Sequence, residues 1–182
     1  MKKVIAAVDP GKSGAIVIME ESGDIISYHA MPQIGKQYNL PELISILKTY
    51  ELHHVAIEDV HAHQMAGNTS SFEFGYGKGV VEMALVAFEI PYTQVQPKLW
   101  QSVAWEGVTK VMLPTKRKNK AGDFVMKVDT KATSLIACQR LFPKMDLRDP
   151  NRKTDRGFKA HDGLVDAILI CYYLHRKLFT KN

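Results

Sequence analysis

The 182-residue sequence predicts an α/β fold in which helices flank one mixed five-stranded sheet. Three short apolar runs open the chain with only tight turns between them, which is typical of an antiparallel meander. Two further apolar runs each follow a segment with helical spacing, which is typical of parallel strands joined by crossovers. The predicted order is β-β-β-α-β-α-β-α-α.

The three antiparallel strands are expected at residues 4–8, 14–20 and 24–31, separated by the turn sequences DPGKS and ESGD. The first helix follows them. Asn39 stands before it as the N-cap, with Glu42 three residues later, which is the spacing of a capping box. Its apolar residues recur at helical spacing and are Leu40, Leu43, Ile44 and Leu47.

The middle of the chain alternates strands with helices. Residues 53–59 (HHVAIED) are short and apolar, as a buried parallel strand should be, and residues 91–96 (PYTQVQ) supply the fifth strand. A long helix is expected between them over residues 70–89, and a short helix begins at Pro97. The residues of the long helix that are expected to be buried are Phe72, Val80, Met83, Val86 and Ala87.

Residues 106–128 form a polar, basic insertion without a clear period, and two glycines and a proline interrupt it. We predict a loop there. Asp129 then caps a helix that Pro143 ends, and a last helix is expected over residues 161–177.

The length fits a single domain over residues 1–182. The net charge of +5 and the pI near 9.1 are compatible with a polyanionic partner. Basic residues gather at 115–120 and 144–159, although such runs are equally typical of solvated loops.

Cys138 and Cys171 both lie in apolar segments, which favours buried, reduced thiols over a disulfide or a metal site. Reduced thiols suit the cytoplasm, where we expect this soluble protein to act. The first apolar run ends at Asp9, so it is too short for a signal peptide, and no run approaches the roughly 18 residues of a membrane span.

Neither glycine-rich segment fits a nucleotide-binding loop. A P-loop that ends in the GKS of VDPGKSGA would begin with a glycine at position 6, where this chain has Ala6, and the segment after the turn reads as a strand instead of a helix. Gly75, Gly77 and Gly79 lie in a predicted helix without GxGxxG spacing, so we interpret them as positions of close helix packing. We therefore expect no nucleotide cofactor, and attention moves to the aspartate that precedes the first turn.

Four carboxylates stand at the ends of apolar elements. Asp9 ends the first strand and Glu58 ends the fourth, and these strand ends are adjacent if the two strands are parallel neighbours. Asp162 and Asp166 lie four residues apart on one face of the last helix. The four side chains can therefore converge, although each one alone is better explained as an N-cap or a solvated residue than as a ligand.

A carboxylate cluster needs compensating cations, because like charges held close together repel. Mg²⁺ prefers oxygen ligands and is usually held by a few carboxylates together with substrate phosphates. Two such ions roughly 3.5–4 Å apart activate a water and stabilise the leaving oxygen in phosphodiester hydrolysis. The sequence thus predicts a two-metal site with Mg²⁺, for which Mn²⁺ can substitute.

Several motifs, in this order, resemble those of RuvC-like Holliday junction resolvases, especially phage-type members. They are VDPGKSGA, VAIEDV, SSFEFGYGKGVVEMAL, VQPKLWQ and HDGLVDAILI. The resemblance implies a ribonuclease H-like fold and a homodimer that uses the glycine-bearing helix. It also implies Mg²⁺-dependent, symmetric nicking of four-way DNA junctions in recombination and repair, in a bacterial or phage-infected cell. By position, Asp9, Glu58 and Asp166 match the metal-binding acids of the family.

The fourth site residue is less clearly defined. The family usually places an acid or a histidine three residues before the last aspartate, which here is Gly163. We choose Asp162 because it shares the helix face of Asp166. His161, about 140° away around the helix, is the alternative as general acid or second ligand.

The resemblance and the basic segments together suggest DNA contacts. His61 follows the glutamate motif where bacterial relatives carry an aromatic residue, and a histidine can stack on a base or remain solvated. Trp100 and Trp105 are interpreted as packing residues. The residues expected to contact DNA are Lys12, His61, Lys98, Lys116, Arg117, Lys118, Lys120, Arg152, Lys153, Arg156 and Lys159.

The leading hypothesis is an endonuclease that resolves four-way junctions, with other branched DNA as further substrates. The alternatives are a ribonuclease H-fold nuclease of broader branched or flap specificity, a non-catalytic junction-binding module, and a relative of actin-like ATPases. The last needs two such domains around its nucleotide, whereas this length supplies one.

Overall fold

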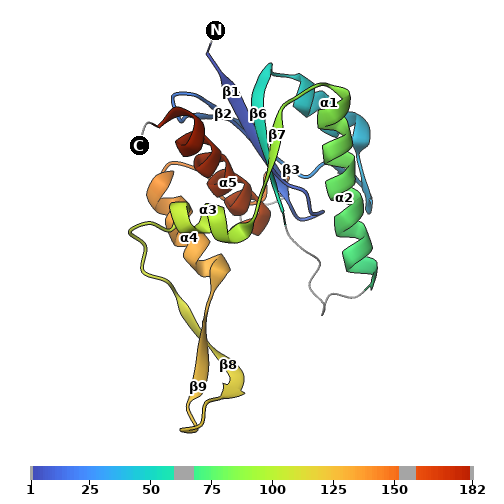
Figure 1. Ribbon diagram of the computed structural model, residues 1–182. Helices are drawn as coiled ribbons and strands as arrows, with labels where there is room; N and C mark the ends of the chain where they lie inside the picture. The colour runs from blue at the N-terminus through green and yellow to red at the C-terminus, as the bar shows by residue number, and fades with distance from the viewer. Residues whose placement is uncertain (1, 60–67, 152–158, 181–182) are drawn as a thin grey trace.

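The computed structural model describes residues 2–59, 68–151 and 159–180. A five-stranded sheet with the order β3-β2-β1-β6-β7 runs through its centre (Figure 1). The strands are β1 (Val4–Asp9), β2 (Ala15–Glu20), β3 (Ile25–Ala30), β6 (Leu52–Glu58) and β7 (Tyr92–Val95). The pairs β1–β2 and β2–β3 are antiparallel, whereas β1–β6 and β6–β7 are parallel. The predicted mixed sheet is confirmed.

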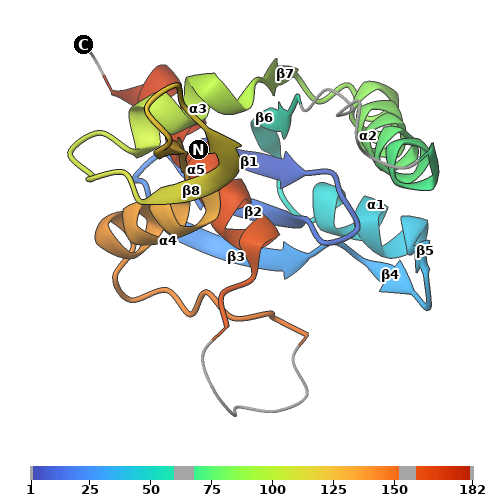
Figure 2. The same cartoon turned by 90° about the horizontal axis from the view of Figure 1, so that it is seen from below.

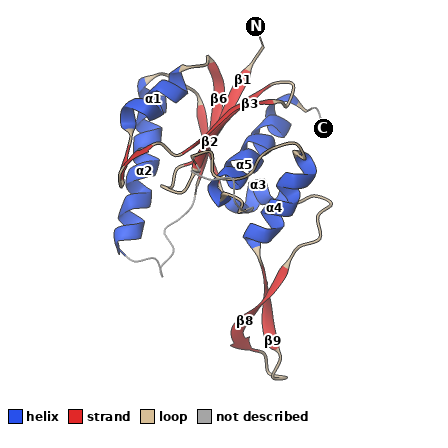
Figure 3. Ribbon diagram, turned by 180° about the vertical axis from the view of Figure 1, so that it is seen from behind, coloured by secondary structure: helices blue, strands red, loops and turns tan. Residues whose placement is uncertain are grey.

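Helices cover both faces of this sheet (Figures 1 and 3). On one face lie α3 (Pro97–Ala104), α4 (Thr130–Leu141) and α5 (Asp162–Phe179); on the other lie α1 (Leu40–Lys48) and α2 (Asn68–Ala87). Alternate residues of β1 enter the two cores, with Ile5 and Ala7 on the α5 side and Ala6 and Val8 on the other. A strand buried on both faces reads as a continuous apolar run, which explains the opening sequence.

Polar residues begin three of the helices. Asn39 Oδ1 accepts from the Glu42 N–H at 3.4 Å while Asn39 Nδ2 donates to Glu42 Oε2 at 2.7 Å, and Asp129 Oδ1 accepts from the Ala132 N–H at 3.1 Å. Both predicted caps are confirmed. The cap of α5 is His161, whereas Asp162 is its first helical residue.

The prediction of a loop over residues 106–128 is wrong. A hairpin of β8 (Met112–Lys118) and β9 (Phe124–Val128) occupies most of this segment and projects beyond α4 (Figure 1), so in the view from below it is drawn in front of the helices (Figure 2). Asn119 organises its turn by accepting from the N–H groups of Ala121 and Asp123 at 2.9 and 3.0 Å, and Gly122 adopts a φ of 89° there. Sequence periodicity missed this hairpin because both of its faces are exposed, so neither strand alternates apolar with polar residues.

Part of the interpretation of α2 is also wrong. Phe72, Met83 and Val86 are 73%, 61% and 55% exposed, and Ala87 is exposed as well. Over residues 71–87 of this helix, where burial is described, the buried residues are instead Val81, Ala84 and Leu85 with Gly77. Apolar residues occur all around α2, so composition alone could not identify its inner face.

Tyr38 approaches α2 from a small hairpin that the sequence did not predict, formed by β4 (Gln33–Ile34) and β5 (Gln37–Tyr38). A Cβ atom on Gly77 would lie 2.2 Å from the Tyr38 hydroxyl oxygen, whereas Gly75 and Gly79 face open space. Close packing is therefore confirmed for Gly77 alone.

Cys138 and Cys171 are buried free thiols, as expected. Within the ranges that the structure describes, no helix combines the length and apolar character needed to cross a membrane.

Candidate active site

Three carboxylates meet at one end of the sheet. Because β1 and β6 are parallel neighbours with Val8 opposite Ile57, their carboxyl ends place Asp9 and Glu58 at the same sheet edge. Asp166 approaches them from the second turn of α5, which packs on β1 and β2. The convergence that the sequence predicted for these three acids is therefore present in the fold.

Burial raises the pKa of each of the three acids, and repulsion by neighbouring acids raises the pKa values of Glu58 and Asp166 further. Burial raises the pKa of Glu58 to about 8, with further increases from the negative charges of Asp9 and Asp166. The pKa of Asp166 rises to about 7, mainly through burial and then through Asp9 and Asp162, while Lys131 lowers it. Burial also raises the pKa of Asp9 to about 6, opposed by a hydrogen bond of 3.2 Å from the Gly11 N–H to Oδ1.

This donor set fits a hard divalent cation. The three side chains offer carboxylate oxygens. A cation between them would stabilise the ionised carboxylates, which burial disfavours, and would relieve the repulsion at Glu58 and Asp166. Across residues 2–59, 68–151 and 159–180, no three His, Cys, Asp or Glu side chains already stand in a metal-binding arrangement. The fit therefore rests on the chemistry and the electrostatics of the donors.

Trp100 completes the buried side of the cluster. Its side chain is 1% exposed, and its indole Nε1 donates to Glu58 Oε1 at 3.1 Å. This hydrogen bond lowers the pKa of Glu58 against the larger effect of burial and fixes one carboxylate oxygen. The interpretation of Trp100 as a packing residue is confirmed, but the sequence analysis did not predict its contact with Glu58. A buried indole N–H requires an acceptor, and that requirement could have indicated the contact.

Two glycines allow α5 to reach the turn between β1 and β2. A Cβ atom on Gly14 would lie 2.0 Å from the Asp9 carbonyl oxygen. A Cβ atom on Gly163 would lie 2.2 Å from the Ser13 carbonyl oxygen and 2.9 Å from Asp9 Oδ2. The position three residues before Asp166 therefore cannot carry a ligand, because the backbone of the turn occupies its side-chain space.

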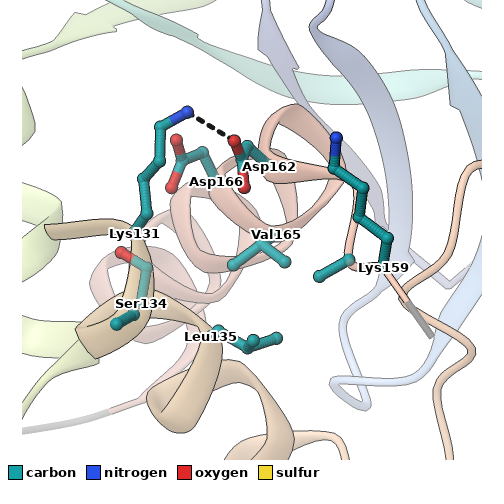
Figure 4. Close-up of a pocket in the computed structure, with 9 residues that line it drawn as sticks. Lys131, Ser134, Leu135, Lys159, Asp162, Val165 and Asp166 are labelled. Atoms are coloured by element: carbon teal, nitrogen blue, oxygen red, sulfur yellow. Dashed lines mark hydrogen bonds and ion pairs between the residues drawn. The ribbon is translucent and has the colours of Figure 1, made fainter.

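Asp162 stands at the outer margin of the cluster. Its side chain is 52% exposed, and its Oδ2 atom lies 2.5 Å from Lys131 Nζ at the start of α4 (Figure 4). Both residues line a cavity of about 210 Å³ together with Ser134, Lys159 and Asp166. Asp162 thus influences Asp166 electrostatically while it pairs with a lysine, unlike the three inner acids.

His161 is held by its capping role. Its Nδ1 atom accepts from the Leu164 N–H at 3.0 Å, so this nitrogen carries no proton and its lone pair is occupied. Only Nε2 is left to serve a ligand or a substrate. The choice between His161 and Asp162 as the fourth site residue stays a prediction.

The residues expected to contact DNA are spread over several regions. Lys159 lies beside the acids, Lys98 is exposed on α3, and Lys12 forms an ion pair with Glu73. Four residues lie on the β8–β9 hairpin or its turn and are exposed, namely Lys116, Arg117, Lys118 and Lys120. Four more lie outside the described residues, namely His61, Arg152, Lys153 and Arg156.

The pKa values of the three acids predict how stability depends on pH in the absence of metal. Between pH 6.5 and 8, Asp166 and Glu58 hold protons in the folded protein that they have lost in the unfolded chain. The free energy of unfolding should therefore fall as the pH rises, by on the order of 2 kcal/mol. Urea unfolding in EDTA measures this slope.

Glu58→Gln should reduce that slope, since it removes one titrating group. The window begins at pH 6.5 because the lowered pKa values of His29 and His54 act in the opposite direction at lower pH. A wild-type slope of zero would contradict the assigned protonation.

The fold is of the ribonuclease H-like α/β class. Its mixed sheet has the order β3-β2-β1-β6-β7, and acids lie at the ends of β1 and β6 and on the last helix. No protein-family model matches the chain, and comparison with curated proteins gives no match. Among solved structures, the chain is similar to Thermus thermophilus RuvC in complex with a Holliday junction substrate, with 13% identity, 97% coverage of both chains and a TM-score of 0.56. It is also similar to a second Thermus thermophilus RuvC structure, with 12% identity, 96% coverage of both chains and a TM-score of 0.57. The fold is that of RuvC, as the sequence resemblance implied.

Proposed function

We propose that this protein is a divalent-metal-dependent endonuclease that resolves four-way DNA junctions. The observation that carries the proposal is the cluster of Asp9, Glu58 and Asp166 on a RuvC fold. Burial raises the pKa of all three acids, and the negative charges of neighbouring acids raise those of Glu58 and Asp166 further. A structural cluster of unneutralised acids would only destabilise the protein, so its presence is explained by a cationic ligand.

The chemistry assigned to the site is hydrolysis of a phosphodiester. Bound Mg²⁺ would activate a water and neutralise the charge that develops on the phosphate. Asp9, Glu58 and Asp166 would supply the anionic oxygens, and the Trp100 indole holds Glu58 in place. Water oxygen bonds to phosphorus as the bond from phosphorus to the 3′ oxygen breaks, which leaves a 5′-phosphate and a 3′-hydroxyl that a ligase can join.

Lys131 and Lys159 suit the approach of the DNA backbone to this site. Both line the cavity beside Asp166, and Figure 4 shows their side chains on either side of Asp162. A phosphate entering the cavity would exchange the Lys131 contact with Asp162 for a contact of its own. The freed Asp162 carboxylate could then bind the metal beside Asp166. For this reason we assign Asp162 as the fourth acid.

The defining experiment compares nicking of a labelled four-way junction with nicking of a linear duplex of the same sequence, with and without Mg²⁺. Junction nicking that requires Mg²⁺ and is absent from the duplex is the expected result. Equal cutting of both substrates would leave a metal-dependent nuclease but remove junction selectivity. The same comparison with Y-shaped and flap substrates distinguishes a resolvase from a nuclease of broader branched specificity.

Symmetric nicking requires two active sites, and we assign the dimer contact to α2. Phe72, Tyr76, Met83 and Val86 form an exposed apolar stripe along this helix, with exposures of 73%, 46%, 61% and 55%. Gly79 lies within the stripe and faces open space, so a second helix can approach closely there. A two-fold contact through this stripe gives one site for each of the two strands that a symmetric cut requires.

Phe72→Glu is expected to convert the dimer into a folded monomer, because a charge would be buried in an apolar contact. Light scattering of the purified protein measures the change in mass. Leu99→Glu is the control, since Leu99 is 51% exposed on α3, which covers the opposite face of the sheet. A Phe72→Glu protein with the mass of the wild-type dimer would rule out this interface.

A further inference from the structure

The β8–β9 hairpin carries the net charge of the whole chain. Six of the 24 basic residues and only one of the 19 acidic residues lie in residues 110–128, so this segment has a net charge of +5. Since the chain as a whole is also +5, the remaining residues balance to zero. A projecting arm that concentrates all the excess positive charge is complementary to a polyanion.

One face of this hairpin carries most of its large exposed apolar side chains, whereas Leu113 and Val125 lie on the other. Met112 pairs with Val128, Pro114 with Met126, and Lys118 with Phe124, and directly paired side chains lie on the same face. Phe124, Met126 and Met112 are 55%, 49% and 46% exposed, so this face is open to solvent. Val125 and Lys127 alternate with these residues and lie on the opposite face.

A cation and an aromatic ring stand together near the tip of the arm. Lys118 Nζ lies 5.1 Å from the centroid of the Phe124 ring, within the range of a cation–π contact. An exposed aromatic ring can stack on an unpaired base, and an adjacent ammonium can bind the phosphate next to that base. A fully paired duplex offers the phosphates but keeps its bases stacked.

We propose that the β8–β9 hairpin is a DNA-binding arm whose apolar face, led by Phe124, stacks on unpaired bases while its basic residues hold the flanking phosphates. This inference rests on the proposed function, because the substrate of that function is a DNA branch point, where bases are unstacked. A second copy of the same arm is a poorer occupant, because two arms of charge +5 repel each other.

Phe124→Ala tests the arm in EDTA, where DNA is bound without being cut. We expect about tenfold weaker binding of a four-way junction and of a single-stranded oligonucleotide, and unchanged binding of linear duplex. Wild-type protein should change the fluorescence of a 2-aminopurine placed at the branch point, and Phe124→Ala should not. Phe124→Trp, which keeps a stacking ring, should bind like wild type.

Val125→Ala is the matched control, since Val125 is 41% exposed on the other face and its change also leaves the charge unaltered. Equal losses in Phe124→Ala and Val125→Ala, or no loss in either, would overturn the proposal. A Phe124→Ala protein that changes mass would instead identify a second copy as the occupant. Because the oligonucleotide has no junction, its binding decides the role of the arm even if junction nicking is absent.

Discussion

Asp9→Asn and Glu58→Gln are each expected to lower Mg²⁺-dependent nicking of a four-way junction by about 10³-fold or more. Both changes keep the size of the side chain and remove one anionic oxygen from the cluster. Binding of the junction in EDTA at pH 7 should be unchanged for Glu58→Gln, since burial keeps Glu58 mostly protonated there, and unchanged or tighter for Asp9→Asn, which removes a negative charge near the DNA phosphates. Single-turnover nicking measures the first effect and fluorescence anisotropy the second.

Asp59→Asn is the matched control for Glu58→Gln. Asp59 follows Glu58 directly, but it forms an ion pair with Lys78 at 2.5 Å and lies outside the cluster. Its replacement should leave nicking within a few-fold of wild type. Nicking by Glu58→Gln at a rate close to wild type would remove Glu58 from the site, even if Asp9→Asn were inactive.

A gain in stability distinguishes loss of a metal ligand from unfolding. Glu58 is 7% exposed, and burial with two neighbouring acids raises its pKa to about 8. Glu58→Gln removes that unfavourable ionisation, so the metal-free variant should be more stable than wild type at pH 8. Mg²⁺ should raise the melting temperature of wild type and not that of the variant, because only wild type retains the full site.

Local signals predicted most of the sheet and the inner part of the site. The turns after Asp9 and Glu20, the cap at Asn39 and the apolar run before Glu58 all depend on neighbours in sequence. The position of Asp9 beside Glu58 followed from strand order alone, because parallel neighbours end at the same sheet edge. The same rule could not place Asp162, whose partner Lys131 lies 31 residues away on another helix.

The features that sequence analysis missed depend on contacts or on solvent. The outward face of α2 is apolar, so no pattern of polarity separated Phe72 from the buried Val81. The hairpin has two exposed faces, so its strands lack the alternation that burial imposes. The bond from Trp100 to Glu58 joins elements 42 residues apart. Each of these features depends on the tertiary structure, which local sequence patterns do not encode.

Gly163→Ala is expected to reduce both stability and nicking, although it changes no polar group. A single methyl group there would lie 2.2 Å from the Ser13 carbonyl oxygen, so α5 would have to move away from the turn that presents Asp9. Overpacking of this kind costs about 1–3 kcal/mol. Urea unfolding measures that loss, and single-turnover nicking measures the second effect, which we expect to exceed tenfold because misplacement by about 1 Å can cost 10²-fold.

Gly75→Ala is the control that isolates the steric effect. Gly75 is also helical, but its Cβ atom would face open space, so alanine should stabilise α2 by up to about 1 kcal/mol through its higher helix propensity. If Gly163→Ala lowers the free energy of unfolding while Gly75→Ala raises it, glycine is required at position 163 by the contact with the turn and not by helix geometry. If Gly163→Ala were as stable as wild type yet inactive, α5 would have shifted without loss of packing, and the distance between Asp166 and Asp9 would be the property that the glycine sets. Full activity in Gly163→Ala would contradict the close approach of α5 to the β1–β2 turn, on which the assignment of Asp166 to the cluster depends.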